Sequence, residues 1–209
     1  MGKYVILDLE MCRVKKEQAA EFGSRTELIQ IGAVLVDEKL EIADSFMTYV
    51  KPQYGEIDPF IEKLTGITPE NVKDAPSSEQ ALDMLVKWMP EDALAVSWSY
   101  SDADQIIAEI DGKHIDNPRM EELLEKWIDC QYTFGEKMNN TERSYKLSEA
   151  LIIADIFYDE NEHDALVDAR NTAQLFIKME KEEEFQVSQY LGSDGGNSFG
   201  FGGIKIKNK

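Results

Sequence analysis

The apolar positions near the start of the chain form an almost continuous run that two acids interrupt. YVILDLEMC, residues 4–12, shows no alternation before Asp8, and such a run is typical of a central strand covered on both faces. Side chains of a strand alternate between its faces, so Asp8 and Glu10 are predicted to share one face. Carboxylates placed together in a dry environment repel each other and lose hydration. Either a divalent cation balances them, since Mg²⁺ and Mn²⁺ prefer oxygen ligands, or the strand ends at Leu7 and both acids lie in a solvated loop.

The pattern after this run predicts two more strands in succession, and then strands that alternate with helices. Apolar residues at 28–36 and 41–52 indicate the second and third strands, and the short link between them favours an antiparallel hairpin. Two later strands are expected at 93–98 and 126–130, and helices at 57–67, 79–89, 102–110, 145–156 and 163–180. This order predicts an α/β fold with a mixed five-stranded sheet, antiparallel at its second strand and flanked by helices.

The composition favours one domain, residues 1–180, followed by an acidic and then glycine-rich flexible tail, residues 181–209. No apolar stretch approaches the roughly 20 residues needed to cross a bilayer, and no secretory signal is recognisable, so we expect no membrane association. Cys12 and Cys130 stand far apart and do not indicate a disulfide framework. We therefore expect a cytoplasmic protein.

Further candidate site residues occur at the starts of two predicted helices. Asp102 and Asp104 open the helix that follows VSW, although acids at a helix N-terminus are also ordinary capping residues. His163 lies just before or at the start of the last helix, where Asp168 adjoins its buried stripe. This histidine is either a surface residue or a base able to deprotonate water. If the acids converge with Asp8 and Glu10, the pocket could hold two cations and clamp a phosphodiester for in-line attack, but spacing alone does not establish the convergence.

These motifs resemble those of the DEDDh family of 3′–5′ exonucleases, which have a ribonuclease H-like fold. The family's Asp-x-Glu motif matches Asp8-Leu9-Glu10, its second Asp matches Asp102 after a Trp-containing strand, and its His-x-Ala-x-x-Asp-Ala motif matches residues 163–169. The resemblance covers roughly residues 3–180, and is strongest to the branch of histone-mRNA and siRNA exonucleases and sporulation-inhibitor-like proteins. Gln30 replaces a Glu of many relatives, and Ser99 a Gly.

The resemblance implies the roles of the site residues. Asp8, Glu10, Asp102 and Asp168 would bind two divalent ions, Mg²⁺ or Mn²⁺, and His163 would be the general base. Asp104 would be a bystander. The family's substrate contacts point to three further residues that could touch the terminal nucleotide: Met11, Leu64 and Thr68. Ordinary core packing is an equal alternative for Met11.

The net charge of −19 opposes broad, nonspecific binding of duplex nucleic acid. Two basic islands, residues 13–25 and 137–146, either flank the pocket and follow a few phosphates or are merely solvated loops. We therefore expect single-stranded or short nucleic acid as the substrate, RNA favoured over DNA, cut from the 3′ end to nucleoside 5′-monophosphates. The alternative is an exonuclease-like module that docks to a larger nucleic-acid-processing complex, with weak or no catalysis.

Overall fold

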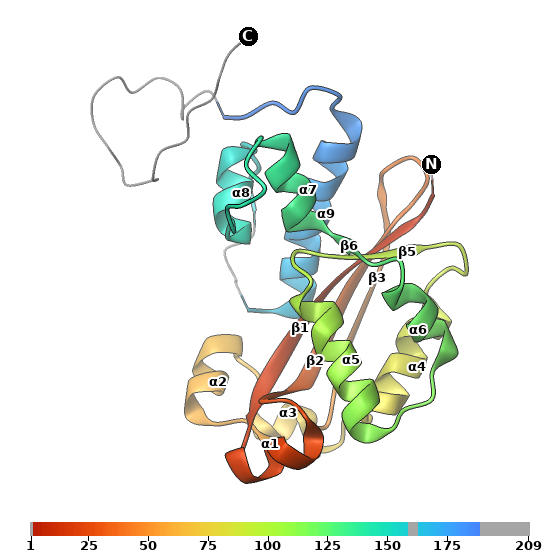
Figure 1. Ribbon diagram of the computed structural model, residues 1–209, viewed down its shortest axis with the longest axis vertical. Coiled ribbons are helices and arrows are strands. Elements are labelled where there is room, and N and C mark those ends of the chain that lie inside the picture. The colour runs from red at the N-terminus through yellow and green to blue at the C-terminus, as the bar shows by residue number, and fades with distance from the viewer. Residues whose placement is uncertain (1, 159–162, 189–209) are drawn as a thin grey trace.

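The computed structural model describes residues 2–158 and 163–188, and its centre is one mixed sheet (Figure 1). The strand order is β3–β2–β1–β5–β6, with β2 antiparallel to both neighbours and β5 parallel to β1 and β6. These are the five predicted strands: β1 (Tyr4–Val14), β2 (Thr26–Val36), β3 (Ile42–Tyr49), β5 (Leu94–Ser97) and β6 (Ile128–Asp129). A sixth strand, β4 (Gly55–Glu56), pairs with the far end of β1 and was not predicted, because two residues carry no periodicity.

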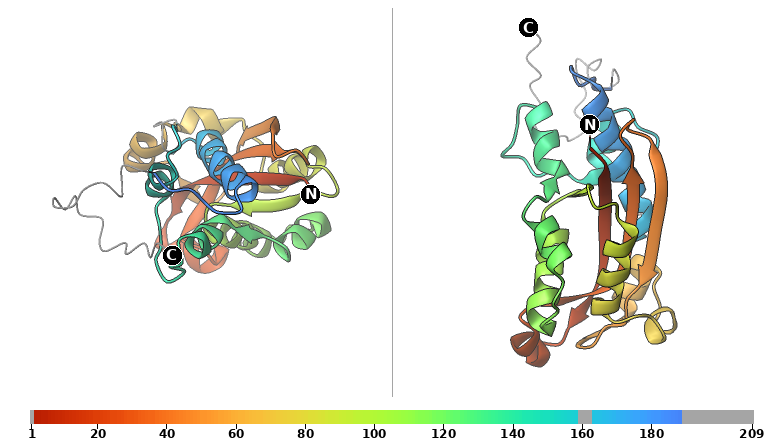
Figure 2. Two further views of the ribbon diagram at one scale, coloured as in Figure 1. Left: turned by 90° about the horizontal axis from the view of Figure 1, so that it is seen from above. Right: turned by 90° about the vertical axis from the view of Figure 1, so that its right-hand side faces the viewer.

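Helices cover both faces of the sheet (Figure 2). One face packs against α4 (Ser78–Trp88), α5 (Ser101–Lys113) and α6 (Pro118–Leu124). The other packs against α7 (Cys130–Lys137), α8 (Leu147–Ile153) and α9 (Ala165–Lys181). The predicted mixed α/β architecture is confirmed.

Three short helices gather at the far end of β1: α1 (Lys16–Phe22), α2 (Pro59–Thr65) and α3 (Pro69–Lys73). Of these only α2 was predicted, and Gly66 closes it with a φ of 70°, a conformation that favours glycine. The helices that were not predicted are short. Each has five to eight residues, too few for an apolar helical stripe to be recognised in the sequence: α1, α3, α6 and α7.

The two faces of β1 have different neighbours along the strand. Val5, Leu7 and Leu9 belong to the core under α4–α6. On the opposite face, Ile6 belongs to the core under α7–α9, and Cys12 belongs to a smaller cluster with residues of α2 and α3. The alternation of a strand therefore puts Asp8 and Glu10 between two apolar clusters on one face.

The chain beyond α9 begins on the surface of α7 and α8. Phe185 packs edge-on against Phe134, with ring centroids 5.8 Å apart, and the Ser188 amide donates to the Ile153 carbonyl at 2.7 Å. Most of the predicted tail, residues 189–209, lies outside the described residues. Within the described ranges, no helix is long and apolar enough to cross a bilayer.

Candidate active site

The site lies where β5 stops and β1 continues. The β1–β5 pairing ends at Leu7 and Ser97, while β1 runs on to Val14. The next amide on that edge of β1, from Leu9, donates instead to the Asp102 carboxylate at 3.1 Å. The alternative in which the first strand ends at Leu7 is therefore wrong.

Two helix starts supply the remaining candidate acids. Asp102 is buried in the first turn of α5, whereas Asp104, two residues later, is exposed. The role of Asp104 as a bystander stays a prediction. Asp164 caps α9 by accepting from the amides of residues 166 and 167. Asp168 lies in the first turn of the same helix and lines the pocket described below.

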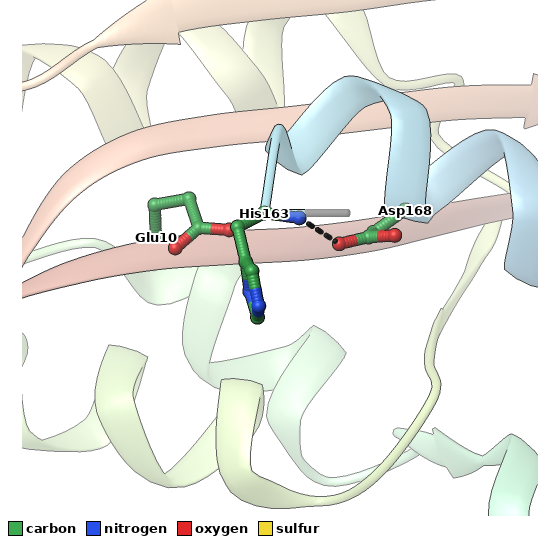
Figure 3. Close-up of side chains that lie close together, drawn as sticks. All are labelled: Glu10, His163 and Asp168. Atoms are coloured by element: carbon green, nitrogen blue, oxygen red, sulfur yellow. Dashed lines mark hydrogen bonds between the residues drawn. The ribbon is translucent and has the colours of Figure 1, made fainter. Parts of the chain in front are cut away.

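Three of the predicted residues come close enough together to hold a metal ion (Figure 3). One ligand atom from each of Glu10, His163 and Asp168 lies within 4.8 Å of the others. The backbone amide of His163, a residue with a φ of 71°, donates to Asp168 Oδ2 at 2.9 Å. In Figure 3 His163 lies between Glu10 and Asp168, and the ligand atom that it contributes is a ring nitrogen. The segment before α9 is thus hydrogen-bonded to the carboxylate of Asp168, which also faces Glu10.

Asp8 lies beside this group and lines a pocket of about 480 Å³. The pocket is also lined by His163 and Asp168, and by Trp98, which directly follows β5. A further wall comes from residues 131 and 144–148, which belong to α7, α8 and the segment between them.

Burial, with added repulsion between neighbouring carboxylates, raises the pKa values of Asp8, Glu10 and Asp102. Burial is the main cause of the raised pKa of Asp8, followed by the charges of Asp102, Asp168 and Glu10. Burial and then the charge of Asp168 raise the pKa of Glu10 to about 8. The pKa of Asp102 is raised to about 7 by burial, against a lowering by the amide of Leu9. Oxygen-rich, mutually repelling groups of this kind fit hard divalent cations, which offset their charge.

The start of α9 is held against β2 by two residues. The side-chain oxygen of Gln30 accepts from the Ala165 amide at 3.2 Å. Gly32, which pairs with Asp8, leaves no room for a side chain: a Cβ there would lie 2.2 Å from the Ala165 carbonyl carbon. The role of Gly32 was missed, although a glycine inside an apolar strand signals close approach of another backbone.

The three predicted substrate contacts lie outside this pocket. Met11 is partly buried and packs against the core under α4–α6, in agreement with its core-packing alternative. Leu64 is exposed on α2, and Thr68 caps α3 in a reciprocal bond with Asn71. Their assignment as substrate contacts stays a prediction.

The two basic islands differ in their relation to the pocket. Residues 137–146 contribute to its lining, because Ser144, Tyr145 and Lys146 belong to its walls. In the island at 13–25, Arg13 pairs with Asp58 and Lys15 with Glu56, at 3.6 and 2.5 Å. These two bases are engaged locally and do not line the pocket.

Several known proteins are similar to this chain. The 3′-5′ exoribonuclease 1 of Rattus norvegicus is 26% identical over 180 residues, which cover 81% of this chain and 52% of that protein. The DNA polymerase III subunit epsilon of Aquifex aeolicus is 28% identical over 190 residues, which cover 88% of this chain and 84% of that protein. The chain thus spans about half the length of the exoribonuclease 1 relatives.

Solved structures confirm the ribonuclease H-like fold. A structure described as 3′-end specific recognition of histone mRNA stem-loop by 3′-exonuclease superposes with a TM-score of 0.74 at 22% identity, covering 89% of this chain and 66% of that one. Cell-death related nuclease 4 superposes with a TM-score of 0.73 at 20% identity, covering 90% and 67%. Residues 5–176 match the RNase_T family, which is described as an exonuclease. The chain therefore belongs to the RNase_T family of exonucleases, as its motifs predicted.

Proposed function

We propose that the protein is a metal-dependent 3′–5′ exonuclease that releases nucleoside 5′-monophosphates from single-stranded or short nucleic acid. The observation that carries this proposal is the meeting of Glu10, His163 and Asp168 within 4.8 Å. His163 and Asp168 also line one pocket together with Asp8. Membership of an exonuclease family and relatives named 3′-5′ exoribonuclease support the polarity.

Four carboxylates would hold the cofactor, two Mg²⁺ or Mn²⁺ ions: Asp8, Glu10, Asp102 and Asp168. Bound divalent ions supply activation of a water nucleophile and stabilisation of the departing 3′ oxygen. The raised pKa values of Asp8, Glu10 and Asp102 support this assignment, because such a group needs added positive charge to be ionised near neutral pH.

His163 would take the proton from the attacking water as general base. Its backbone is fastened to Asp168 by the 2.9 Å hydrogen bond, so one carboxylate both faces the cation site and positions the base. A ring nitrogen of His163 lies within 4.8 Å of carboxylate oxygens of both Glu10 and Asp168, so the imidazole borders the cation site.

We favour RNA over DNA as the substrate, because the relatives at 26% identity are exoribonucleases. The pocket of about 480 Å³ and the net charge of −19 favour a short, single-stranded end over a duplex. Both cysteines are free and buried, which supports the proposed reducing, cytoplasmic location.

A docking module within a larger machine is the second candidate. It is favoured by a PolC-type DNA polymerase III from Caldanaerobacter subterraneus, 30% identical over 196 residues, which cover 89% of this chain but only 12% of that protein. Such a module would bind nucleic acid or a basic partner without turnover.

The two candidates separate in one assay with single-stranded RNA and DNA labelled at either end. The exonuclease shortens both stepwise from the 3′ end with Mn²⁺, and loses this activity in EDTA and on Asp8→Ala. Asp104→Ala, at an exposed acid of α5, is the matched control and keeps full activity. Absence of turnover by a folded, metal-loaded protein would favour the docking module.

A further inference from the structure

One cation of the basic island at 137–146 lies in the pocket without an ionic partner among the described residues. Lys137 donates to the Glu182 carbonyl at 3.3 Å, and Arg143 forms an ion pair with Glu149. Lys146 lines the pocket and forms no ion pair within residues 2–158 and 163–188. Its charge is therefore available to a ligand.

The backbone just before Lys146 is fixed by two side chains. The Tyr145 carbonyl accepts from the Trp98 indole at 3.2 Å and from the Gln131 amide at 2.8 Å. The Tyr145 ring, 2% exposed, packs edge-on against Phe134 with ring centroids 5.0 Å apart. Lys146 thus starts from a rigid position on the pocket wall, which lowers the entropy lost when it contacts a ligand.

The same pocket carries opposite charges on its different walls. Asp8 and Asp168 contribute carboxylates from β1 and α9, whereas Lys146 contributes an ammonium just before α8. An anionic ligand in this pocket would be attracted directly by the ammonium of Lys146. It would contact the carboxylates only through a bound cation.

We propose that Lys146 binds the phosphate of the nucleotide on the 5′ side of the scissile bond. This inference rests on the proposed exonuclease function. The 3′-terminal nucleotide of a chain with a free 3′ hydroxyl has only one phosphate, the scissile one, which the acids hold through cations. A second phosphate within the pocket belongs to the preceding nucleotide, so Lys146 selects chains over single nucleotides.

The test compares Lys146→Gln with Lys16→Gln, which removes the same charge from an exposed position on α1. Each is assayed with Mn²⁺ on a single-stranded RNA pentamer and on the p-nitrophenyl ester of uridine 5′-monophosphate, which has no preceding nucleotide. We expect Lys146→Gln to raise KM for the pentamer about tenfold, as for loss of a charge-assisted hydrogen bond, with kcat nearly unchanged. The ester should be hydrolysed as by the wild type, and Lys146→Arg should restore KM.

Binding provides a second readout that does not depend on turnover. The affinity for a fluorescent RNA pentamer in EDTA should fall for Lys146→Gln, and the slope of log Kd against log salt should decrease by about 0.7. Equal loss on both substrates, or unchanged KM and Kd, overturns the proposal. If the wild type hydrolyses neither substrate, the exonuclease function fails, and the binding measurement alone decides whether Lys146 contacts the strand.

Discussion

The amide of Leu9 and the carboxylate of Asp102 form a hydrogen bond of 3.1 Å between residues 93 positions apart in the chain. The bond lies just beyond the last pair of β1 and β5, where the strand amide would otherwise lack a partner. Asp102 therefore completes the edge of the sheet and, with Glu10, is one of two buried acids at the site.

Replacing Asp102 separates these two contributions. Asp102→Asn keeps an oxygen that can accept from Leu9, whereas Asp102→Ala leaves a buried amide unpaired. We expect both variants to lose activity. The alanine variant should also unfold at a lower urea concentration, because its free energy of unfolding should be about 1–3 kcal/mol smaller than that of the asparagine variant.

Urea denaturation in EDTA measures this difference. Equal stability of the two variants would show that the Leu9 amide finds another partner, for example water. Asp104→Asn and Asp104→Ala, two residues away on an exposed position, should differ only through helix propensity.

The stability of the metal-free protein should fall as pH rises. The folded pKa of Glu10 is about 8 and that of Asp102 about 7, both above the value of about 4 for an unfolded carboxyl. Folded carboxyls with raised pKa hold protons more tightly than unfolded ones, so their contribution is complete below about pH 4 and is lost as pH rises towards 8.

Thermal melts in EDTA between pH 5 and 9 check this expectation. We expect Tm to fall by about 5 °C or more over this range, and Mn²⁺ to restore it most strongly at high pH. Asp8→Asn should flatten the profile and weaken the response to Mn²⁺. A Tm in EDTA that rises with pH across the range would contradict the raised pKa values.

The sequence predicted the strands and acids because each has a strong local signal. β1 and β2 are long, apolar and 11 residues each, and the spacing of Asp8 and Glu10 on a strand fixes their common face. The convergence of these two acids with Asp102 and Asp168 was accessible only through family resemblance, since it depends on where β5 ends and how α9 crosses β2.

Other features had no readable local signal. Lys146 and Gln131 line the pocket because the Tyr145 carbonyl accepts a hydrogen bond from the Trp98 indole. These two residues are 47 positions apart in the sequence. The island at 13–25 resembled the one at 137–146 in charge, but Arg13 and Lys15 pair with acids of the segment around β4. Charge counts along a sequence do not reveal such pairing, because the partners come from another segment.

Gly32→Ala should disturb the site without touching any acid. A Cβ at this position would lie 2.2 Å from the backbone of Ala165, so α9 must move away from β2 and carry Asp168 with it. A displacement of about 1 Å at a catalytic group can cost about a hundredfold in rate, and we expect a loss of that order.

Activity and Tm should be measured together on Gly32→Ala. Gln30→Leu, which removes the acceptor of the Ala165 amide, should lower activity in the same direction. Gly2→Ala is the control, because a Cβ there meets nothing within 4 Å. Full activity of a folded Gly32→Ala protein would show that the contact with Ala165 does not set the position of Asp168.

A buried ion network at the C-terminal end of α5 should contribute strongly to stability. Lys113, at the end of α5, lies 2.5 Å from Glu27 and 2.6 Å from Glu109, and also donates to Ser78 at 2.7 Å. The side chain of Lys113 is 8% exposed and both glutamates are fully buried. Removing the ammonium leaves two carboxylates without a cation, so Lys113→Met should cost about 3–5 kcal/mol.

The exposed pair of Lys87 and Asp83, 3.8 Å apart, provides the control, since Lys87→Met should leave the urea midpoint almost unchanged. Adding Glu27→Gln and Glu109→Gln to Lys113→Met should recover part of the lost stability, because the destabilisation comes from the unpaired charges. No recovery would mean that packing and hydrogen bonds of the network contribute more than charge pairing. These bonds include the three that Glu27 accepts from the backbone amides of residues 53–55.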